Sequence, residues 1–452
     1  MTYGNRWFSS VRNPRLRAQK ENVIAGDIYD RNGVLLATTD EEGNRIYQAN
    51  EEARRAIVHL IGDAQGNVAN GVETFQTAYL YGFHASVPEL LHSAFTGEAR
   101  RGDNVFLTVD SALCTELMRS FSRNSATKGK RGAAVVMNYE TGEILAEISL
   151  PNYDPMAITA TASTSTDEPF WNRATQSVYP PGSTFKIITT AAAIKYLEGA
   201  GNATQNCTGN LELDGHEIHD FGNAVHGRLT LKQAFGVSCN NIFASIAVQL
   251  GDSRLRQTAE KFGFNDNFLF KDMVVENSQY PTAASRSAYE VGASGFGQSS
   301  LAATPMHMCM VAAGIAKNGV MQEPILLREV RSPSGDVRMT WSSRVYRTAV
   351  EQDVAGVLQE YMRYVVTNGT ATRVSNRNLP ICGKTGTAES TLKGKPVNYG
   401  WFVGYADDPY LPLAVSVVVE DIDDGTGGGS TAALIARDAF LYALDYADRL
   451  RN

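Results

Sequence analysis

Three apolar runs near the carboxyl end place the strongest constraint on how this chain can fold. They are PICGKTGTA at residues 380–388, YGWFVGYA at 399–406 and LPLAVSVVVED at 411–421. Each has the length and the β-branched or aromatic content of a strand. Because short connections join the runs, they predict consecutive strands of an antiparallel sheet.

Other segments predict the partners of these strands. The runs GAAVVMNYE at 132–140 and EILAEISL at 143–150 are joined by Thr141-Gly142 and predict a hairpin. Helices are predicted at 111–123 and at 431–450, where apolar residues of the second recur at intervals of three and four. We therefore expect an α+β fold with an antiparallel sheet flanked by helices.

The composition is that of a globular protein without a surface for polyanions. Of 452 residues 43% are hydrophobic, and 41 basic against 48 acidic residues leave a net charge of −7. This excludes disordered and fibrous classes, and no nucleic-acid partner is expected. Five scattered cysteines, an odd number, do not predict a disulfide framework. No window of 18 apolar residues is present, so no segment of this sequence is expected to span a membrane.

The chain is expected to divide between residues 103 and 104. Before this point the elements are short, with a strand–turn–strand pattern at 23–37 whose turn is Arg31-Asn32-Gly33. After it the longer strands and helices begin. We predict a smaller N-terminal domain at 1–103 and a larger domain at 104–452.

The strongest candidate for chemistry is the pair Ser183 and Lys186. Three residues apart on a helix, the hydroxyl and the amine lie on one face. The same Ser-x-x-Lys spacing recurs at 125–128 and 390–393, but only Ser183 follows a Pro-Pro-Gly helix start, where unpaired N–H groups favour negative charge. Only Lys186 precedes an apolar helix that can remove water from the amine and lower its pKa.

Two further motifs follow in order. Ser238-Cys239-Asn240 is one, although its bare pattern recurs at 122–124, and Lys384-Thr385-Gly386-Thr387 occurs once, in a predicted strand. A glycine there lets a substrate backbone lie close to the strand. Taken alone, the three motifs are explained at least as well by a helix cap, a surface turn and a strand end, respectively. All three in this order indicate a shared site.

With these motifs the chain resembles the penicillin-binding proteins, serine acyltransferases marked by Ser-x-x-Lys, Ser-x-Asn and Lys-Thr-Gly. The resemblance extends over residues 104–452, through segments that surround the three motifs. These are TGEILA at 141–146, PNYDP at 151–155, NRA at 172–174, GFGQ at 295–298, TP at 304–305 and WFVG at 401–404.

The first hundred residues are similar to the pedestal of class B penicillin-binding proteins, the monofunctional transpeptidases. The similar segments are NPR at 13–15, GDIYDRNG at 26–33 and GVE at 71–73, whereas Ala25 stands where the family usually has Arg. About a hundred residues leave no room for the glycosyltransferase domain of a class A protein. The resemblance thus implies a serine transpeptidase and β-lactamase-like domain on a smaller pedestal.

The resemblance implies peptidoglycan cross-linking by attack of Ser183 on a D-Ala-D-Ala stem peptide, with Lys186 as base and Ser238 as proton relay. Asn240, Lys384, Thr385, Gly386 and Thr387 then bind substrate, and the N–H groups of Ser183 and Thr387 form the oxyanion hole. No cofactor is required. The implied partners are stem peptides or a lipid-linked precursor, β-lactams and a membrane glycosyltransferase. An anchor ahead of residue 1 and an extracytoplasmic catalytic domain are expected.

Two alternative functions are weighed. A β-lactamase of class D shares this scaffold but normally lacks both the pedestal and an asparagine such as Asn240. A β-lactam sensor or structural protein, which would acylate or bind without turnover, is usually a single domain fused to a signalling membrane segment. Both are disfavoured by residues 1–103.

A metal site is the last candidate. Cys207, Asp220, His226 and Cys239 offer thiolate, carboxylate and imidazole groups that suit a closed structural zinc site. The order of the last three resembles a zinc-binding subset of class B penicillin-binding proteins, with His216 or His219 as substitute ligands. The other interpretation stays open, in which the cysteines are reduced buried thiols. The acidic run at 421–425 lacks the glycine and glutamate of a calcium loop, so we do not expect a cation site there. We expect a mobile connector beside the strand of the third motif instead, with Gly427 to Gly429 letting the chain turn into the last helix.

Overall fold

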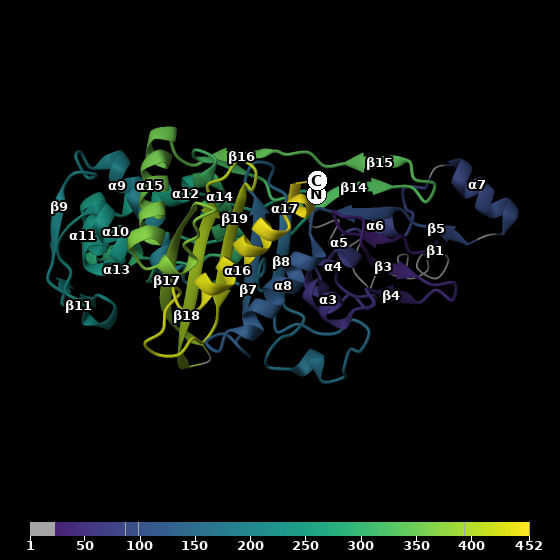
Figure 1. Ribbon diagram of the computed structural model, residues 1–452, viewed down its shortest axis with the longest axis horizontal. Coiled ribbons are helices and arrows are strands. Elements are labelled where there is room, and N and C mark those ends of the chain that lie inside the picture. Colours follow the sequence, from purple (N-terminus) through teal and green to yellow (C-terminus); the bar gives the residue numbers. More distant parts are fainter. Residues whose placement is uncertain (1–22, 86, 98, 393, 452) are drawn as a thin grey trace.

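The computed structural model describes residues 23–85, 87–97, 99–392 and 394–451, and the NPR segment at 13–15 lies outside them. Its two largest sheets have five and six strands and lie next to each other along the long axis of the molecule (Figure 1). Helices α9 to α13 gather at the end of the molecule beyond the five-stranded sheet (Figure 1).

The five-stranded sheet has the order β17-β18-β19-β7-β8 and is antiparallel throughout. Its strands are β7 (Gly132–Asn138), β8 (Ile144–Leu150), β17 (Ile381–Leu392), β18 (Lys395–Ala406) and β19 (Leu413–Val419). The predicted hairpin and the three consecutive strands are therefore confirmed. Strand β17, which carries Lys384 and Thr387, forms one edge of the sheet.

Helices cover both faces of this sheet, as predicted. Helix α14 (Pro305–Ala316) packs on β7, β18 and β19, and α16 (Ala432–Asp445) packs on β18, β19 and α8 (Ser111–Arg123). The bounds of α8 agree with the sequence prediction. The final helix does not run unbroken to residue 450, because the chain leaves helical geometry at Tyr446 and restarts as α17 (Ala447–Arg451).

The remaining helices and small strand pairs surround the nucleophile segment. The helices are α9 (Lys186–Tyr196), α10 (Leu231–Val237), α11 (Asn240–Leu250), α12 (Asp252–Lys261), α13 (Ala288–Gly295) and α15 (Gln352–Asn368). The pairs are β9 (Thr204–Cys207) with β12 (Gly227–Thr230), β10 (Asn210–Leu213) with β11 (His216–His219), and β13 (Val320–Gln322) with β16 (Val345–Thr348). Within the residues described, no helix combines the length and hydropathy needed to cross a membrane.

The six-stranded sheet has the order β15-β14-β6-β2-β3-β4 and draws strands from distant parts of the chain. Its strands are β2 (Ile28–Tyr29), β3 (Leu35–Thr39), β4 (Arg45–Tyr47), β6 (Asn104–Leu107), β14 (Leu327–Arg331) and β15 (Val337–Thr340). Nearby lie β1 (Val23–Ile24), β5 (Arg100–Arg101), α3 (Glu51–Ala56), α4 (Val58–Ile61), α5 (Val72–Phe75), α6 (Thr77–Leu80) and α7 (Val87–Thr96). The domain division at residue 103 stays a prediction, and this sheet contains strands from both sides of it.

Buried polar contacts join the N-terminal elements to the larger domain. Arg54 of α3 forms a two-pronged ion pair with Asp154, with nitrogen–oxygen distances of 2.8 and 2.6 Å. Asp63 accepts a short hydrogen bond from Tyr153. Both partners belong to the PNYDP segment at 151–155. Charge-assisted hydrogen bonds of this kind hold two surfaces in one relative position.

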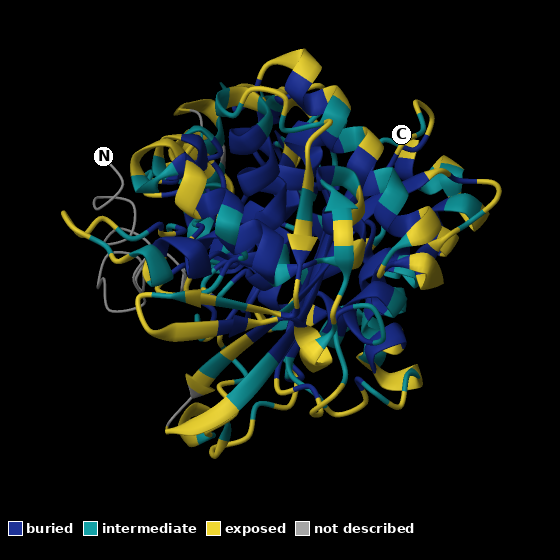
Figure 2. Cartoon of the chain, turned by 90° about the vertical axis from the view of Figure 1, so that its left-hand side faces the viewer, coloured by how far each residue is buried: buried dark blue, intermediate teal, exposed yellow. Residues whose placement is uncertain are grey.

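The interior around the nucleophile helix is densely packed, and Figure 2 shows buried residues filling the centre of the molecule. Glycines permit the closest approaches of backbone to backbone. The Gly182 N–H donates to the Gly297 carbonyl at 3.0 Å, and a Cβ atom on Gly297 would lie 1.9 Å from the Gly182 oxygen. Gly297 also has φ +82°, a value that disfavours side chains.

We predict that Gly297→Ala destabilises the protein much more than Gly335→Ala. Both glycines have positive φ, +82° and +96°, but a Cβ on Gly335 would meet no atom within 4 Å. The backbone conformation costs both variants roughly 1–2 kcal/mol. The clash adds about 1–3 kcal/mol at residue 297 alone. Unfolding measured side by side checks this, and equal losses of stability would contradict it.

Candidate active site

The predicted nucleophile lies on a tight turn ahead of the apolar helix. Ser183 is in a 3₁₀ turn, η2 (Gly182–Phe185), and Lys186 is the first residue of α9. The predicted helix start is therefore confirmed, with its first turn wound more tightly than an α-helix. The Trp401 indole N–H of β18 donates to the Pro180 carbonyl at 3.1 Å and holds the Pro-Pro-Gly segment against the sheet.

Lys186 is fully buried, and its amine faces the second motif. Its Nζ atom lies 2.5 Å from the Ser238 carbonyl oxygen, 3.1 Å from Ser238 Oγ and 2.9 Å from Asn240 Oδ1. Burial lowers the pKa of Lys186 to about 7. The amine can therefore lose its proton near neutral pH, as a general base requires.

Lys384 reaches the same hydroxyl from the sheet. Its Nζ atom lies 2.9 Å from Ser238 Oγ and 2.8 Å from the Thr385 carbonyl oxygen. Lys384 is also fully buried. Burial, and after it the charge of Lys186, lower the pKa of Lys384 well below its usual value. Two buried amines thus meet at one serine hydroxyl.

Ser238 has an unusual backbone. It ends α10 with φ +63° and ψ +39°, a left-handed conformation that non-glycine residues rarely adopt. Its N–H closes the last turn of α10, and the next residue, Cys239, begins α11 as its N-cap. In this turn between the two helices, Ser238 Oγ lies within reach of both lysine amines. Such strain is typical of functional sites.

Among the described residues, the Ser183 hydroxyl has no hydrogen-bond partner in this structure, and Lys186 is held by the second motif instead. Ser183 itself is partly exposed. A neutral amine has two donors and one lone pair. The Ser238 carbonyl and Asn240 Oδ1 can take the two donors, which leaves the lone pair for a hydroxyl proton.

The third motif packs directly against the nucleophile turn. A Cβ on Gly386 would lie 3.2 Å from the Thr184 nitrogen, and one on Gly182 would lie 2.5 Å from the Thr387 oxygen. Strand β17 therefore lies directly beside the turn that carries Ser183. The glycines make this approach sterically feasible.

Two residues at the third motif were missed from the sequence. Thr370 Oγ1 lies 2.5 Å from Thr385 Oγ1, and a Cβ on Gly428 would lie 2.5 Å from the Gly386 oxygen. Gly428 belongs to the glycine-rich stretch that the sequence assigned to a connector beside this strand. The stretch does lie beside this strand. Gly425 is the one residue of 425–429 with a positive φ, so close backbone contact explains these glycines better than a turn does. No local signal marks Thr370.

The four candidate metal ligands lie together. Their ligand atoms are all within 4.8 Å of one another, although they come from the end of β9, the segments after β11 and before β12, and the N-cap of α11. Asp220 Oδ2 is 2.9 Å from Cys207 Sγ, 3.3 Å from Cys239 Sγ and 3.3 Å from His226 Nδ1. Two thiols, one imidazole and one carboxylate fit a tetrahedral zinc ion.

The substitute ligands do not join this cluster. His216 is exposed and stacks on Tyr289, and His219 is exposed and lies 3.2 Å from Glu217. The other carboxylate oxygen of Asp220 accepts a short hydrogen bond from the Asn240 N–H. The cluster is therefore linked to the second motif twice, through Cys239 within that motif and through this hydrogen bond to Asn240.

Comparison with known proteins gives a consistent result. A family model described as the penicillin binding protein transpeptidase domain matches residues 132–441. The peptidoglycan D,D-transpeptidase PbpA of Mycolicibacterium smegmatis is 31% identical over 400 residues, which cover 84% of this chain and 80% of that protein. PbpA of Mycobacterium tuberculosis is 30% identical over 376 residues, which cover 77% and 74% of the two chains.

Solved structures agree with these relatives. The imipenem acyl-enzyme complex of penicillin-binding protein A from M. tuberculosis matches with a TM-score of 0.84 at 27% identity, over 94% of this chain and 100% of that chain. Because residues 104–452 make up less than 94% of the chain, the match includes N-terminal elements as well as the larger domain. Because the family model matches more than half of this chain, the chain belongs to the penicillin-binding protein transpeptidase family and is a class B member of it.

Proposed function

We propose that this chain cross-links peptidoglycan by D,D-transpeptidation, with Ser183 as the nucleophile. The observation that carries the proposal is the convergence of two buried lysines on Ser238, beside a turn that presents a partly exposed serine. The relatives are D,D-transpeptidases, and the similar M. tuberculosis structure is an acyl-enzyme. β-Lactams, which resemble the D-Ala-D-Ala amide, acylate the same serine.

Acylation begins with transfer of the Ser183 proton to the neutral amine of Lys186. Ser183 Oγ then forms a bond to the carbonyl carbon of the penultimate D-Ala. The carbon–nitrogen bond to the terminal D-Ala breaks, and Lys186 returns the proton to the leaving amine through the Ser238 hydroxyl. An amine of a second stem peptide then attacks the ester carbon and gives a proton to Lys186. The ester carbon–oxygen bond breaks as this proton passes to Ser183 Oγ, which restores the hydroxyl.

Binding is assigned to the second and third motifs. Asn240 holds the substrate backbone, and Lys384, Thr385 and Thr387 bind the terminal carboxylate, while Gly386 leaves room for the substrate chain beside β17. The N–H groups of Ser183 and Thr387 stabilise the negative oxygen that develops during attack. The close contact of η2 with β17 supports this pairing of N–H groups.

The alternatives make different predictions for the acyl-enzyme. A β-lactamase hydrolyses it rapidly, and a sensor keeps it but releases no D-Ala from a stem peptide. The match of the transpeptidase family model over residues 132–441 favours turnover of stem peptides.

We predict that a fluorescent penicillin labels Ser183 durably. Ser183→Ala should remove the label, whereas Ser125→Ala should keep it, because Ser125 shares the Ser-x-x-Lys spacing without the site. Gel fluorescence followed over hours measures both, together with D-Ala release from a stem peptide. Rapid loss of label from the wild type would favour a β-lactamase. Durable label without release of D-Ala would favour a sensor.

We predict that acylation depends on pH with a midpoint near 7. Burial lowers the pKa of Lys186 to about 7, and only the neutral amine accepts the Ser183 proton. The rate should therefore fall about tenfold per pH unit below the midpoint and level off above it. Lys195→Met, at the exposed end of the same helix, serves as control and should leave the profile unchanged. A midpoint near the ordinary lysine value would refute the role of Lys186.

A structural zinc ion is proposed at Cys207, Asp220, His226 and Cys239. These four residues would hold zinc in a closed site without a water ligand, where the ion would stabilise the structure rather than take part in catalysis. The chain's own residues transmit its effect, since Asp220 accepts from the Asn240 N–H and Cys239 lies between Ser238 and Asn240. Their role is to fix the second motif relative to Lys186.

We predict about one equivalent of zinc in protein purified without a histidine tag. Cys239→Ser should lose the metal and lower the melting temperature. Cys382→Ser, which changes another buried thiol outside the cluster, should retain it. Elemental analysis and thermal unfolding check this, and metal-free wild-type protein would favour the interpretation of reduced thiols.

The proposed substrate also implies where the enzyme acts. Peptidoglycan stem peptides are cross-linked outside the cytoplasm, so the catalytic domain is proposed to be extracytoplasmic. A membrane anchor ahead of residue 1 and a membrane glycosyltransferase partner, which would supply the glycan strands, stay predictions.

A further inference from the structure

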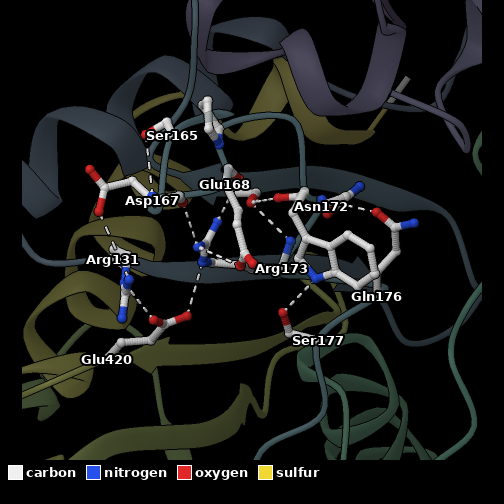
Figure 3. Close-up of polar contacts among 12 residues, drawn as sticks. Arg131, Ser165, Asp167, Glu168, Asn172, Arg173, Gln176, Ser177 and Glu420 are labelled. Atoms are coloured by element: carbon white, nitrogen blue, oxygen red, sulfur yellow. Dashed lines mark hydrogen bonds and ion pairs between the residues drawn. The ribbon is translucent and has the colours of Figure 1, made fainter. Parts of the chain in front are cut away.

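A buried arginine lies ten residues before the nucleophile and outside the three motifs. The Arg173 side chain is 3% exposed. Its Nε donates to Glu420 Oε1 at 2.9 Å, and its two terminal nitrogens donate to the Asp167 carbonyl at 2.8 Å and the Glu168 carbonyl at 3.2 Å (Figure 3). Arg173 therefore joins the loop before it to the end of β19.

Glu420 is the centre of this cluster. It directly follows β19, and its side chain is 7% exposed. One carboxylate oxygen accepts from both Arg173 and the Tyr179 hydroxyl, the latter at 2.7 Å, and the other lies 2.8 Å from Arg131 Nε (Figure 3 shows the arginines). Each buried charge is thus compensated by partners in good geometry, which makes the cluster rigid.

Tyr179 transmits this rigidity to the nucleophile turn. It precedes Pro180 in sequence, and its ring packs edge-on against Tyr399 and Trp401 of β18, with centroids 5.2 and 6.0 Å away. Trp401 in turn binds the Pro180 carbonyl. Strand β18 pairs with β17, where Trp401 lies opposite Gly386. The segment before Ser183 is therefore held to the strand next to the third motif.

We propose that Arg173, Tyr179 and Glu420 are positioning residues for acylation. They hold the Pro180–Ser183 turn at a set distance from β17, so that the Ser183 hydroxyl and the Thr387 N–H face the same carbonyl group. None of the three touches the reacting atoms. The proposal rests on the function assigned to Ser183 and extends it to residues outside the three motifs.

A positioning role should affect the rate constant of acylation but not the noncovalent affinity for the substrate. Substrate binding is assigned to Asn240 and to residues of β17, and among the described residues none of these is a hydrogen-bond or ion-pair partner of Arg173, of Glu420 or of the Tyr179 hydroxyl. Reaction depends on where Ser183 lies, and a misplacement of about 1 Å lowers a rate roughly a hundredfold. Loosening the cluster should therefore lower the rate constant of acylation while the noncovalent affinity for a β-lactam changes little.

The test compares variants of the cluster with variants of a second buried ion pair. Arg45 and Glu73, in the N-terminal elements, are 2.6 Å apart and 5% and 2% exposed. Tyr179→Phe, Arg173→Met and Glu420→Gln are measured beside Arg45→Met and Glu73→Gln. Stopped-flow acylation by a penicillin gives the rate constant and the dissociation constant separately, and thermal unfolding reports stability.

We expect each cluster variant to acylate at least about tenfold more slowly than the control of similar stability, with the dissociation constant nearly unchanged. Arg173→Lys, which keeps the charge, should recover part of the rate. Tyr179→Phe leaves both ion pairs of Glu420 in place, so it carries the test even where Arg173→Met or Glu420→Gln fails to fold.

Rates equal to those of the controls would overturn the positioning role. Wild-type protein in which label does not attach to Ser183 would instead refute the proposed function itself, so the two failures are distinguishable. Slower acylation in Arg173→Lys than in Arg173→Met would also contradict the proposal.

Discussion

The site depends on the burial of two amines around one hydroxyl. Lys186 and Lys384 are both fully buried, and the described partners of their amines are hydroxyl, amide and carbonyl oxygens rather than carboxylates. Burying an unpaired ammonium is so costly that the group gives up its proton instead. The fold therefore supplies neutral acceptors, from Ser238, Asn240 and Thr385, and the lowered pKa of Lys186 suits its proposed role as general base.

Three separate elements must be placed correctly relative to one another to bring both amines to the Ser238 hydroxyl. Lys186 begins α9, Ser238 lies in a strained turn between α10 and α11, and Lys384 lies on the edge strand β17. Close glycine contacts bring the nucleophile turn onto β17, and the cluster around Glu420 is proposed to hold the segment before this turn through Tyr179, which packs on β18. The proposed zinc site acts on Ser238 in a comparable way, through the backbone of its neighbours.

Much of this was predictable from local sequence, and the rest depends on pairing between distant residues. The bounds of α8, the hairpin of β7 and β8 and the strands β17 to β19 follow from hydrophobic period and turn residues. The motif order predicted that the two lysines and Ser238 share a site, and ligand chemistry predicted the four residues of the candidate metal cluster, whose ligand atoms do lie together. By contrast, three features join residues that are distant in sequence. These are the sheet shared by β2, β6 and β14, the contact of Thr370 with Thr385, and the Glu420 cluster, in which Arg173 and Glu420 are 247 positions apart. Local periodicity carries no information about such pairs.

The most direct measurement of the central claim is the titration of the two buried lysines. Protein labelled with ¹³C at lysine Cε can be followed by NMR across the pH range, with Lys186→Met and Lys384→Met to assign the two signals. Two lysines should titrate far below the surface lysines, with Lys186 near pH 7. If every lysine titrates close to the ordinary value of about 10, both amines are charged at neutral pH and the account is wrong.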